Sequence, residues 1–344
     1  MRARAVNAAV QTPVEPSWLD WIAENRLRGC STESMLQAMR QRGISAEAAA
    51  AAIQQIEQQP VFRTAERLAQ RLAKLESVLG NLQRQWQYAP GYGQVQRRGE
   101  MTAEQFLHEH VIAQRPVVLT DLARGWPALQ RWTPQWLAQQ YGHVSVQVQA
   151  GRSRVPDYEE RKLALRDEMP LAELVQRVLA PGAGNDTYLT ANNQALQRPG
   201  LAPLLDDIGA MPPYLDRSQL PGAVMLWLGP AGTLTPLHHD TVMLMHTQIV
   251  GRKRWHLVSP LETPKLDNQR GVFSPIDLEH PDLARWPALA AVQVLDVTVQ
   301  AGETLFLPLG WWHQVRALDV CISLSFTNLA WPNHFDYRNP EPRV

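Results

Sequence analysis

The sequence predicts a mainly β fold, a sandwich or barrel of short strands, which follows a wholly helical N-terminal region. Two observations carry this prediction. Beyond residue 95, short runs rich in β-branched, aliphatic and aromatic residues recur with Pro or Gly between them. Before that point, apolar residues recur at helical spacing behind serines that can cap helices. The 344 residues are enough for one large domain and a smaller one.

Three short helices are expected at the start of the chain. Ser17 is expected to cap a helix through Leu27, and Ser31 to cap a second one that Gly43 ends. Ser45 precedes the alanine-rich stretch AEAAAAAIQQIEQQ, which indicates a third. Three short helices are also compatible with helix-turn-helix DNA binding, but the balanced charge and the lack of a basic recognition helix argue against nucleic acid as a partner.

A longer helix is expected next, and its apolar residues form a seam at alternating steps of four and three. Two interpretations stay open. The seam either packs against neighbouring helices of the same chain or pairs with a second copy, which would make the protein a homodimer. The seam consists of Leu68, Leu72, Leu75, Leu79, Leu82 and Trp86.

The segment YAPGYGQVQ, residues 88–96, is rich in Pro and Gly and is expected to end the helical region. We therefore divide the chain into an α-helical N-terminal region, residues 1–90, and a β domain, residues 91–344. If the seam is intermolecular, the N-terminal region serves dimerisation. The strand candidates of the second part are RPVVLTDL, VSVQVQAG, TYLTAN, AVMLWLG, HTQIVG, KRWHLVSP, VQVLDVTV, TLFLPLG and VCISLSF.

The composition excludes several classes of protein. The 33 basic and 33 acidic residues give a formal net charge of zero, which argues against general attraction to nucleic acid or to an anionic membrane. No apolar run reaches the ~18 residues of a membrane span, and the N-terminus has no apolar core of a secretory signal. Cys30 and Cys321 are the only cysteines, too few for a disulfide framework, so a cytoplasmic location is expected.

The stretch TLTPLHHDTVMLMH, residues 233–246, places polar side chains in an otherwise apolar, strand-like segment. Residues of a strand alternate between its faces, so His238 and Asp240 are expected on one face and His239 on the other. One imidazole and one carboxylate are two-thirds of the 2-His-1-carboxylate set that binds Fe(II) and leaves coordination positions open. The pattern alone is weak, because it recurs at residues 280–282 and 334–336, although without strand-like surroundings.

The set needs a second histidine from a distant strand. His313 follows a Pro/Gly turn in ETLFLPLGWWHQV, and a barrel whose inward faces converge would bring it to His238. On spacing alone, the alternative is equally good: a lone buried histidine under Trp311 and Trp312, satisfied by a backbone carbonyl.

Over residues 95 to 335 the chain resembles the Jumonji C, cupin-like 2-oxoglutarate oxygenases. The segments that carry the resemblance, in order, are RPVVLTDLARGWPALQRWTPQWLAQQYG, TPLHHDTVMLMHTQIVGRKRWHLVSP, SPIDLEHPDLARWPAL and AGETLFLPLGWWHQVRALDVCISLSFTN. The branch that it resembles includes the asparaginyl hydroxylase of the hypoxia response. The resemblance implies a double-stranded β-helix (cupin, jelly-roll) fold, with Fe(II), 2-oxoglutarate as cosubstrate, and O2.

The resemblance also implies roles for seven residues. His238, Asp240 and His313 match the metal triad, which is also the catalytic centre. Lys253, in GRKRW, matches the lysine that pairs with the distal carboxylate of 2-oxoglutarate; the alternative for it is a solvated hairpin lysine. The further contacts to the cosubstrate that the resemblance implies are Thr235, Tyr188 and Asn328.

The chain departs from the family pattern at two positions. Relatives often carry Asn four residues after the metal aspartate, where this chain has Leu244, so one polar contact to the cosubstrate is lost. His246 stands at a position that is usually apolar and, by strand alternation, shares a face with Asp240. We interpret it either as a fourth polar group of the pocket or as a core histidine or hydrogen-bonding replacement for the missing Asn.

Three functions stay open at this point. The branch implies hydroxylation of a C–H bond in a protein or peptide side chain, which yields succinate and CO2. The same chemistry suits a free amino acid or a small natural product. The third function is that of a non-catalytic cupin-fold binding protein. Lysine demethylation is a further Jumonji activity, and manganese or zinc also fits these ligand types.

Overall fold

The computed structural model describes residues 14–268 and 271–335. The chain divides into two compact units, the first ending at Leu82 and the second beginning at Gln83. Each unit is described by itself. The domain boundary predicted from the sequence, between residues 90 and 91, stays a prediction.

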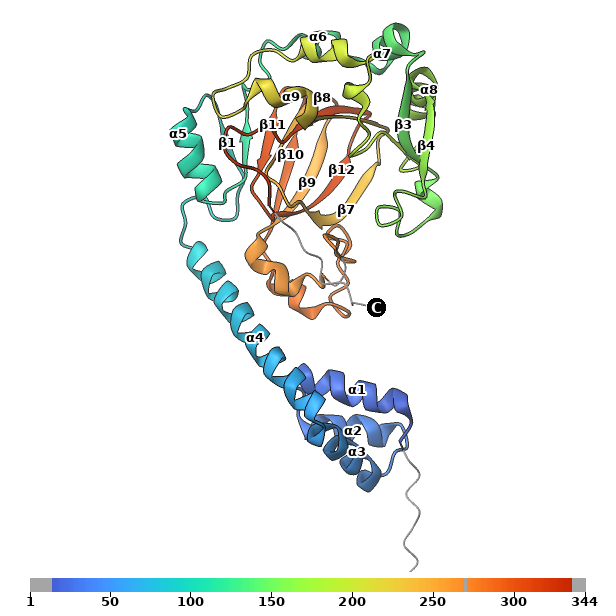
Figure 1. Cartoon of the computed structure of the whole chain (residues 1–344), viewed down its shortest axis with the longest axis vertical. Helices are drawn as coiled ribbons and strands as arrows, with labels where there is room; N and C mark the ends of the chain where they lie inside the picture. Colours follow the sequence, from blue (N-terminus) through green and yellow to red (C-terminus); the bar gives the residue numbers. More distant parts are fainter. Residues whose placement is uncertain (1–13, 269–270, 336–344) are drawn as a thin grey trace, which may run out of the picture. The chain divides into compact units, whose positions relative to one another are not determined.

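The first unit is helical, as the sequence predicts (Figure 1). Ser31 and Ser45 are confirmed as helix caps, because their hydroxyl oxygens accept the backbone N–H groups of Ser34 and Ala48, each at 3.2 Å. Its helices are α1 (Pro16–Leu27), α2 (Thr32–Gln41), α3 (Ala46–Gln58) and the greater part of α4 (Pro60–Trp86), which continues into the second unit.

The prediction that Ser17 caps the first helix is wrong. Helix α1 begins one residue earlier, at Pro16, and its N-terminus has no side-chain cap. A proline suits the first helical turn because its N–H would find no partner there and its φ is already helical. The core of this unit is formed by apolar side chains of all four helices, among them Ile22, Met35, Ile53 and Phe62.

The leucine seam of α4 lies on an exposed surface. The exposed fractions are 63% for Leu68, 57% for Leu72, 58% for Leu75 and 45% for Leu82. The interpretation that the seam packs against the chain's own helices is therefore wrong for these four leucines within the described part of the chain.

The second unit is built from two facing sheets, which are antiparallel except for the pair β1 and β2 (Figure 1). From β6 onward, the strands alternate between the sheets, except that β9 and β10 are neighbours in one of them. This alternation is the double-stranded β-helix that the sequence predicts. One sheet has the order β1 (Gln96–Arg98), β2 (Val117–Leu119), β11 (Thr304–Leu307), β8 (Leu244–Val250), β13 (Cys321–Phe326), β6 (Val224–Gly229). The other has the order β10 (Val294–Val299), β9 (Lys253–Val258), β12 (Trp312–Ala317), β7 (Leu234–His239).

A third, smaller sheet and several helices surround this barrel. Figure 1 shows α6, α7 and α9 over one end of it and α8 beside β3 and β4. The small sheet has the order β4 (Arg166–Pro170), β3 (Ser145–Ala150), β5 (Thr187–Tyr188). The α- and π-helices are α5 (Ala103–Phe106), η1 (Leu107–Ile112), α6 (Pro127–Arg131), α7 (Pro134–Tyr141), α8 (Leu171–Leu179) and α9 (Leu220–Ala223). The 3₁₀ helices are η2 (Arg152–Arg154), η3 (Ala195–Gln197), η4 (Ala202–Asp207), η5 (Arg217–Gln219), η6 (Pro260–Lys265) and η7 (Pro287–Ala291).

Each predicted strand segment contains a strand, but β1 and β4 were not predicted. Strand β4 has the sequence RDEMP, in which only Met169 is buried, so it carries no apolar alternation. Its partner β3 does alternate, and the pairing runs in register from Ser145 opposite Pro170. An exposed edge strand of this kind is specified by its neighbour rather than by its own pattern.

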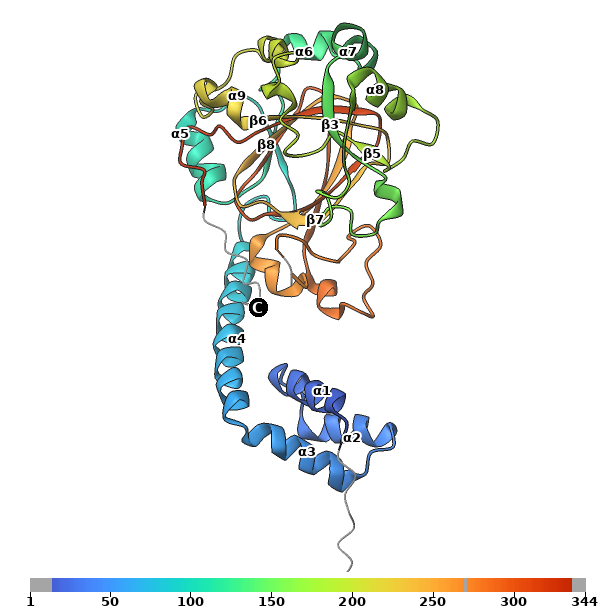
Figure 2. The same cartoon turned by 45° about the vertical axis from the view of Figure 1, so that its right-hand side comes forward.

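The long connection between β9 and β10 lies beside the open edge of β7 (Figure 2). The backbone N–H of His239 donates to the carbonyl of Val272 at 3.0 Å, and that of Ser274 donates to the carbonyl of Leu237 at 2.9 Å. These bonds cover the edge of the strand that carries His238. No helix of the described residues is both long and apolar enough to cross a membrane.

Candidate active site

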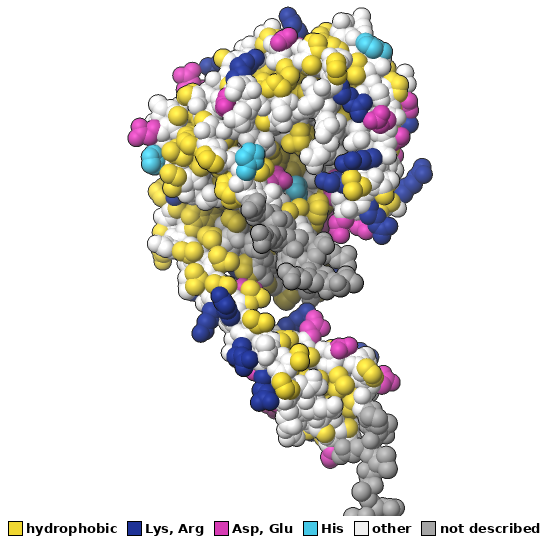
Figure 3. Space-filling model, in the orientation of Figure 1, with side chains coloured by type: hydrophobic (Ala, Val, Ile, Leu, Met, Phe, Trp, Pro, Cys, Tyr) yellow, Lys and Arg dark blue, Asp and Glu magenta, His cyan; other side chains and the backbone are white. Residues whose placement is uncertain are grey.

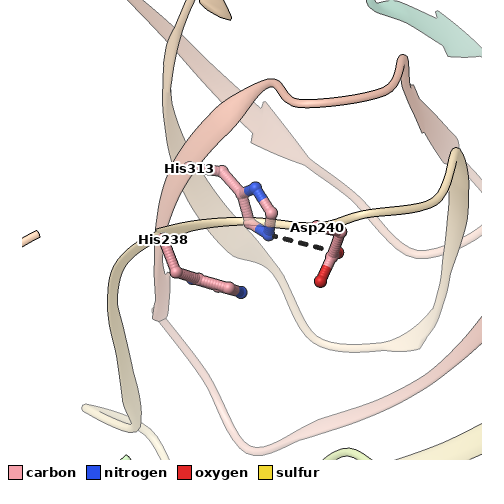
Figure 4. A group of neighbouring side chains, drawn as sticks. All are labelled: His238, Asp240 and His313. Atoms are coloured by element: carbon pink, nitrogen blue, oxygen red, sulfur yellow. Dashed lines mark ion pairs between the residues drawn. The ribbon is translucent and has the colours of Figure 1, made fainter. Parts of the chain in front are cut away.

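The second unit brings His238, Asp240 and His313 together (Figure 4). Strands β7 and β12 are antiparallel neighbours with His238 opposite His313, and the centroids of the two rings are 4.1 Å apart. Asp240 follows the end of β7, with its Oδ2 3.8 Å from Nε2 of His313. One ligand atom from each of the three residues lies within 4.8 Å of the other two.

Backbone carbonyls fix the tautomer of both histidines. Nδ1 of His238 lies 2.8 Å from the carbonyl oxygen of Pro236, and Nδ1 of His313 lies 2.9 Å from that of Trp311. A carbonyl only accepts, so both Nδ1 atoms carry the proton and both Nε2 atoms keep a lone pair. Burial, and next the neighbouring His238, lower the pKa of His313 to about 3. Two neutral imidazoles and a carboxylate are the donor set that Fe(II) accepts in a facial triad.

A β-bulge explains why Thr235 shares a face with His238. An odd separation along a regular strand would place the two side chains on opposite faces. Here Thr235 is opposite Val315 and His238 is opposite His313, so two residues of β7 face the single residue Gln314 of β12. The extra residue re-aims the strand, as bulges beside active sites do.

A cavity of about 200 Å³ extends between the sheets from the three candidate ligands. Figure 3 shows a hollow on this face, with hydrophobic side chains around it and histidine and acidic side chains visible within. Thr235, Tyr188 and Lys253, predicted from the resemblance, all line the cavity. Gly229 at the end of β6 makes room for Tyr188, because a Cβ atom there would lie 2.5 Å from its ring.

Lys253 places an ammonium group at the buried end of the site. Its side chain is 2% exposed, and its Nζ donates to the Tyr188 hydroxyl at 3.1 Å and lies 3.5 Å from Nε2 of His246. Burial lowers the pKa of Lys253 to about 8. Within residues 14–268 and 271–335, no carboxylate forms an ion pair with it. A buried cation costs several kcal/mol unless an anion compensates it, which makes this end of the cavity an anion site.

The flanking arginines behave differently from Lys253. Arg252 pairs with Asp319 and Arg254 with Asp296, and both arginine side chains are about half exposed. The alternative of a solvated hairpin cation therefore holds for the two arginines and is wrong for Lys253.

The comparison with protein families agrees with this geometry. A model of the cupin-like domain matches residues 103–334, about two thirds of the chain. The chain belongs to the cupin-like family. Named relatives place it among the Jumonji C 2-oxoglutarate oxygenases of that family, whose members generally use Fe(II) and 2-oxoglutarate.

Three relatives illustrate the similarity. Lysine-specific demethylase 8 of Xenopus tropicalis is 31% identical over 65% of this chain and 50% of its own length. Jumonji C domain-containing protein 5 of Drosophila melanogaster is 30% identical over 65% of this chain and 57% of its own. The human bifunctional peptidase and (3S)-lysyl hydroxylase JMJD7 is 28% identical over 64% of this chain and 79% of its own. The chain thus spans only about half the length of the first two, and the asparaginyl hydroxylase branch stays a prediction.

The cupin-like barrel does not bring every predicted residue to the cavity. Asn328 is buried, but it is not among the residues that line the cavity, and its Nδ2 donates to the backbone carbonyl of Asp216 at 2.8 Å. Its predicted contact with 2-oxoglutarate has no support in this geometry. His239 lies off the triad, as predicted, with its ring edge-on to Trp312 at 4.7 Å.

The two departures from the family pattern both lie in the cavity wall. Leu244 and His246 on β8 line it, so His246 does share the inward face with Asp240. His246 is next to Lys253 rather than next to the metal ligands. It is therefore a polar group of the pocket, whereas Leu244 leaves the polar contact of the missing asparagine unfilled.

Sequence reasoning missed the two tryptophans of the cavity wall, Trp227 and Trp255. Trp255 is two residues after Lys253 on β9, so strand alternation alone was a sufficient signal for it. Its Nε1–H is buried and has no hydrogen-bond partner among the described residues. Buried indole N–H groups normally find an acceptor, so this donor also fits a ligand rich in oxygen atoms.

The H-x-D pattern at residues 280–282 lies beside a second cluster of metal-type donors, whose carboxylates already have protein partners. Asp277, Glu279 and His280 cluster, but Asp277 accepts from Gln314 at 2.7 Å and Glu279 pairs with Arg316. His280 itself is 79% exposed. In the pattern at residues 334–336, Asp336 lies outside the described residues.

Proposed function

We propose that this protein is an Fe(II)- and 2-oxoglutarate-dependent dioxygenase that hydroxylates a C–H bond in a side chain of a protein or peptide. The observation that carries the proposal is a single cavity with three metal-type donors at one end and an uncompensated ammonium at the other. In this proposal, His238, Asp240 and His313 hold the iron. Lys253, Tyr188 and Thr235 hold the cosubstrate.

The donor set fits iron for reasons of chemistry. Two neutral imidazoles and one carboxylate occupy three positions of an octahedral ion and leave three open, enough for a chelating cosubstrate and O2. When bound, Fe(II) and 2-oxoglutarate supply the oxidising power for hydroxylation, and succinate and CO2 are the by-products. The protein itself has to hold these groups, aim the substrate C–H bond and keep water out.

The residues at the buried end bind and orient the cosubstrate. The Lys253 ammonium supplies the charge for a carboxylate. Burial raises the pKa of Tyr188, so its hydroxyl stays protonated and can donate to the same carboxylate while it accepts from Lys253. Thr235 adds a hydroxyl from the bulged strand. Apolar side chains of the cavity wall, Val242, Leu244 and Met225, help to exclude water.

The names of the relatives support a protein side chain as the substrate class. One is a (3S)-lysyl hydroxylase and others are lysine-specific demethylases. Hydroxylation at carbon adds one oxygen atom to the product, whereas hydroxylation of an N-methyl group ends in its loss. Mass spectrometry of peptides after incubation with the protein, Fe(II), 2-oxoglutarate and air distinguishes these outcomes.

The first test is anaerobic. Fe(II) and 2-oxoglutarate are added to purified protein, and the weak visible charge-transfer band of the chelate is measured. We expect the band in the wild type and in His239→Ala, since His239 lies off the triad, but not in His313→Ala. If the wild type shows no band and forms no succinate in air, the oxygenase proposal is overturned in favour of a binding protein.

We further propose a homodimer through the exposed seam of α4. Leucines repeat at heptad spacing, and Leu68, Leu72 and Leu75 are more than half exposed. Such a surface is self-complementary, because it presents the same apolar spacing to a second copy. Replacing Leu72 and Leu75 with Glu should halve the mass in light scattering. An unchanged mass would contradict the dimer.

The cytoplasmic location also remains a proposal. It is supported by the two cysteines, Cys30 and Cys321, which form no disulfide.

A further inference from the structure

His246 is buried beside the ammonium of Lys253, in the wall of the cavity and outside the cluster of candidate metal ligands. Its side chain is 3% exposed, and its Nε2 is 3.5 Å from Nζ of Lys253. The two residues come from strands of opposite sheets, β8 and β9. Both therefore point inward and meet between the sheets, in the wall of the same cavity.

The chemistry of this pair allows one arrangement. An ammonium has three N–H donors and no acceptor, so His246 must accept through Nε2 and carry its proton on Nδ1. Burial, and next the charge of Lys253, lower the pKa of His246 well below its usual value, so the ring stays neutral. A neutral acceptor stabilises the buried charge, whereas a second cation would repel it.

Two tryptophans hold the His246 ring in this orientation. The ring lies edge-on to Trp255 at 4.8 Å and 67°, and edge-on to Trp227 at 6.1 Å and 60°. Trp227 also faces the ammonium, with Nζ 5.5 Å from its ring centroid. The acceptor is thus fixed by packing on both sides, and a fixed acceptor can direct a flexible side chain such as lysine.

We propose that His246 is a positioning residue for 2-oxoglutarate, which acts by orienting the Lys253 ammonium toward the distal carboxylate. The inference rests on the proposed function. One N–H of Lys253 goes to Tyr188 and one to His246, which leaves one for the ligand. With an apolar residue at 246, Tyr188 is the one remaining acceptor for the ammonium among the described residues. The lysine side chain must then be ordered when the ligand binds, which costs conformational entropy and weakens binding. Leu244 offers no polar contact, so the orientation of the cosubstrate depends more on this end.

The test is a pair of variants with a matched control. His246→Leu removes the acceptor, and His246→Gln restores an acceptor near the position of Nε2. The control is His256→Leu, another buried histidine, which lies on the outward face of β9 and does not line the cavity. Binding is measured by calorimetry on Mn(II)-loaded protein, with 2-oxoglutarate and with 2-oxobutanoate, a 2-oxo acid that lacks the distal carboxylate.

We expect a selective effect. His246→Leu should raise the Kd for 2-oxoglutarate about tenfold and leave that for 2-oxobutanoate unchanged, because only the first ligand reaches Lys253. His246→Gln should recover affinity to within about threefold of the wild type. With Fe(II) in air, His246→Leu should raise KM for 2-oxoglutarate and keep kcat at saturation. His256→Leu should change none of these values.

The outcomes separate this inference from the proposed function. No binding of 2-oxoglutarate to the wild type overturns the proposed function and the inference together. If the wild type binds it, equal affinity in His246→Leu overturns the inference alone, and so does an equal loss for both acids, which a general structural defect would produce. If His246→Leu does not fold, His246→Asn replaces it. Its shorter amide does not reach Nζ, and unchanged affinity in that variant overturns the inference.

Discussion

The two ends of the cavity are built by different means. At the metal end, main-chain carbonyls of Pro236 and Trp311 hold the imidazoles, so the geometry follows from the pairing of β7 with β12. At the anion end, Lys253 is held by other side chains, Tyr188 and His246. The metal end is therefore determined by the fold, whereas the anion end depends on which residues occupy a few positions.

The largest effect is expected from breaking the metal end. Asp240→Ala removes the single anionic ligand, and succinate formation should fall by roughly three orders of magnitude or more. The folded state should persist, since the Asp240 side chain is 38% exposed and its carboxylate pairs, among the described residues, only with His313. Its thermal melting curve, together with a titration of Fe(II), checks this expectation. Wild-type metal affinity in Asp240→Ala would show that the triad is misassigned.

Breaking the anion end should have a smaller and more specific effect. Lys253→Met keeps the length of the side chain and removes its charge, and the Kd for 2-oxoglutarate should rise about 100-fold. Metal affinity should stay as in the wild type, because Lys253 is not in the ligand cluster. Arg254→Met is the control on the same strand, and its exposed ion pair with Asp296 predicts no change in binding. Equal effects of the two substitutions would remove Lys253 from the site.

The dependence of 2-oxoglutarate binding on pH tests the charge at the anion end. Burial lowers the pKa of Lys253 from 10.5 to about 8. Only the ammonium binds a carboxylate, so the Kd for 2-oxoglutarate should be flat well below pH 8 and rise roughly tenfold per pH unit above it. The titratable groups around the ammonium do not reverse this sign, since Tyr188 and Cys321 have raised pKa values and His246 is neutral. Calorimetry at several pH values, with Lys253→Met as the expected flat reference, measures the slope. A flat wild-type profile would contradict an uncompensated ammonium.

The smallest effect is expected from the hydroxyl of Thr235 in the cavity wall. Thr235→Val removes one hydroxyl at constant shape, and the Kd for 2-oxoglutarate should rise about three- to tenfold with kcat little changed. The β-bulge that places Thr235 is made by the main chain, so the variant should fold normally. A larger loss of metal binding than of cosubstrate binding would show that Thr235 supports the triad instead.

The metal end could be predicted from the sequence, and the physical reason is its dependence on strand alternation. Side chains two residues apart on a strand share a face, so the pairing of His238 with Asp240 followed from the pattern. The choice of His313 as a ligand, rather than as a lone core histidine, needed the family resemblance. Thr235 also came only from the resemblance, because the bulge that brings it to the cavity has no signal in a period of two. Alternation did predict that His246 faces inward.

The rest could not be predicted because it depends on contacts between distant segments. Nothing in the sequence around Asn328 shows that its amide is taken up by the backbone of Asp216. The contact of His246 with Lys253 joins opposite sheets, so its existence depends on how the barrel closes. The start of α1 was missed for a local reason. Pro16, which suits the first helical turn, and Ser17, which suits a cap, are adjacent, and the helix begins at Pro16.

The carbonyl acceptors of Pro236 and Trp311 have a consequence for how such a protein changes over time. A main-chain oxygen is present whatever residue occupies its position, so point mutation cannot delete it. The acceptors that hold the two imidazoles are therefore insulated from single substitutions at positions 236 and 311, provided that the strands still pair. At the anion end the groups that hold Lys253 are side chains, so a single substitution there can remove one of them. Evolution or protein engineering can thus change which anion the pocket binds without changing the metal site.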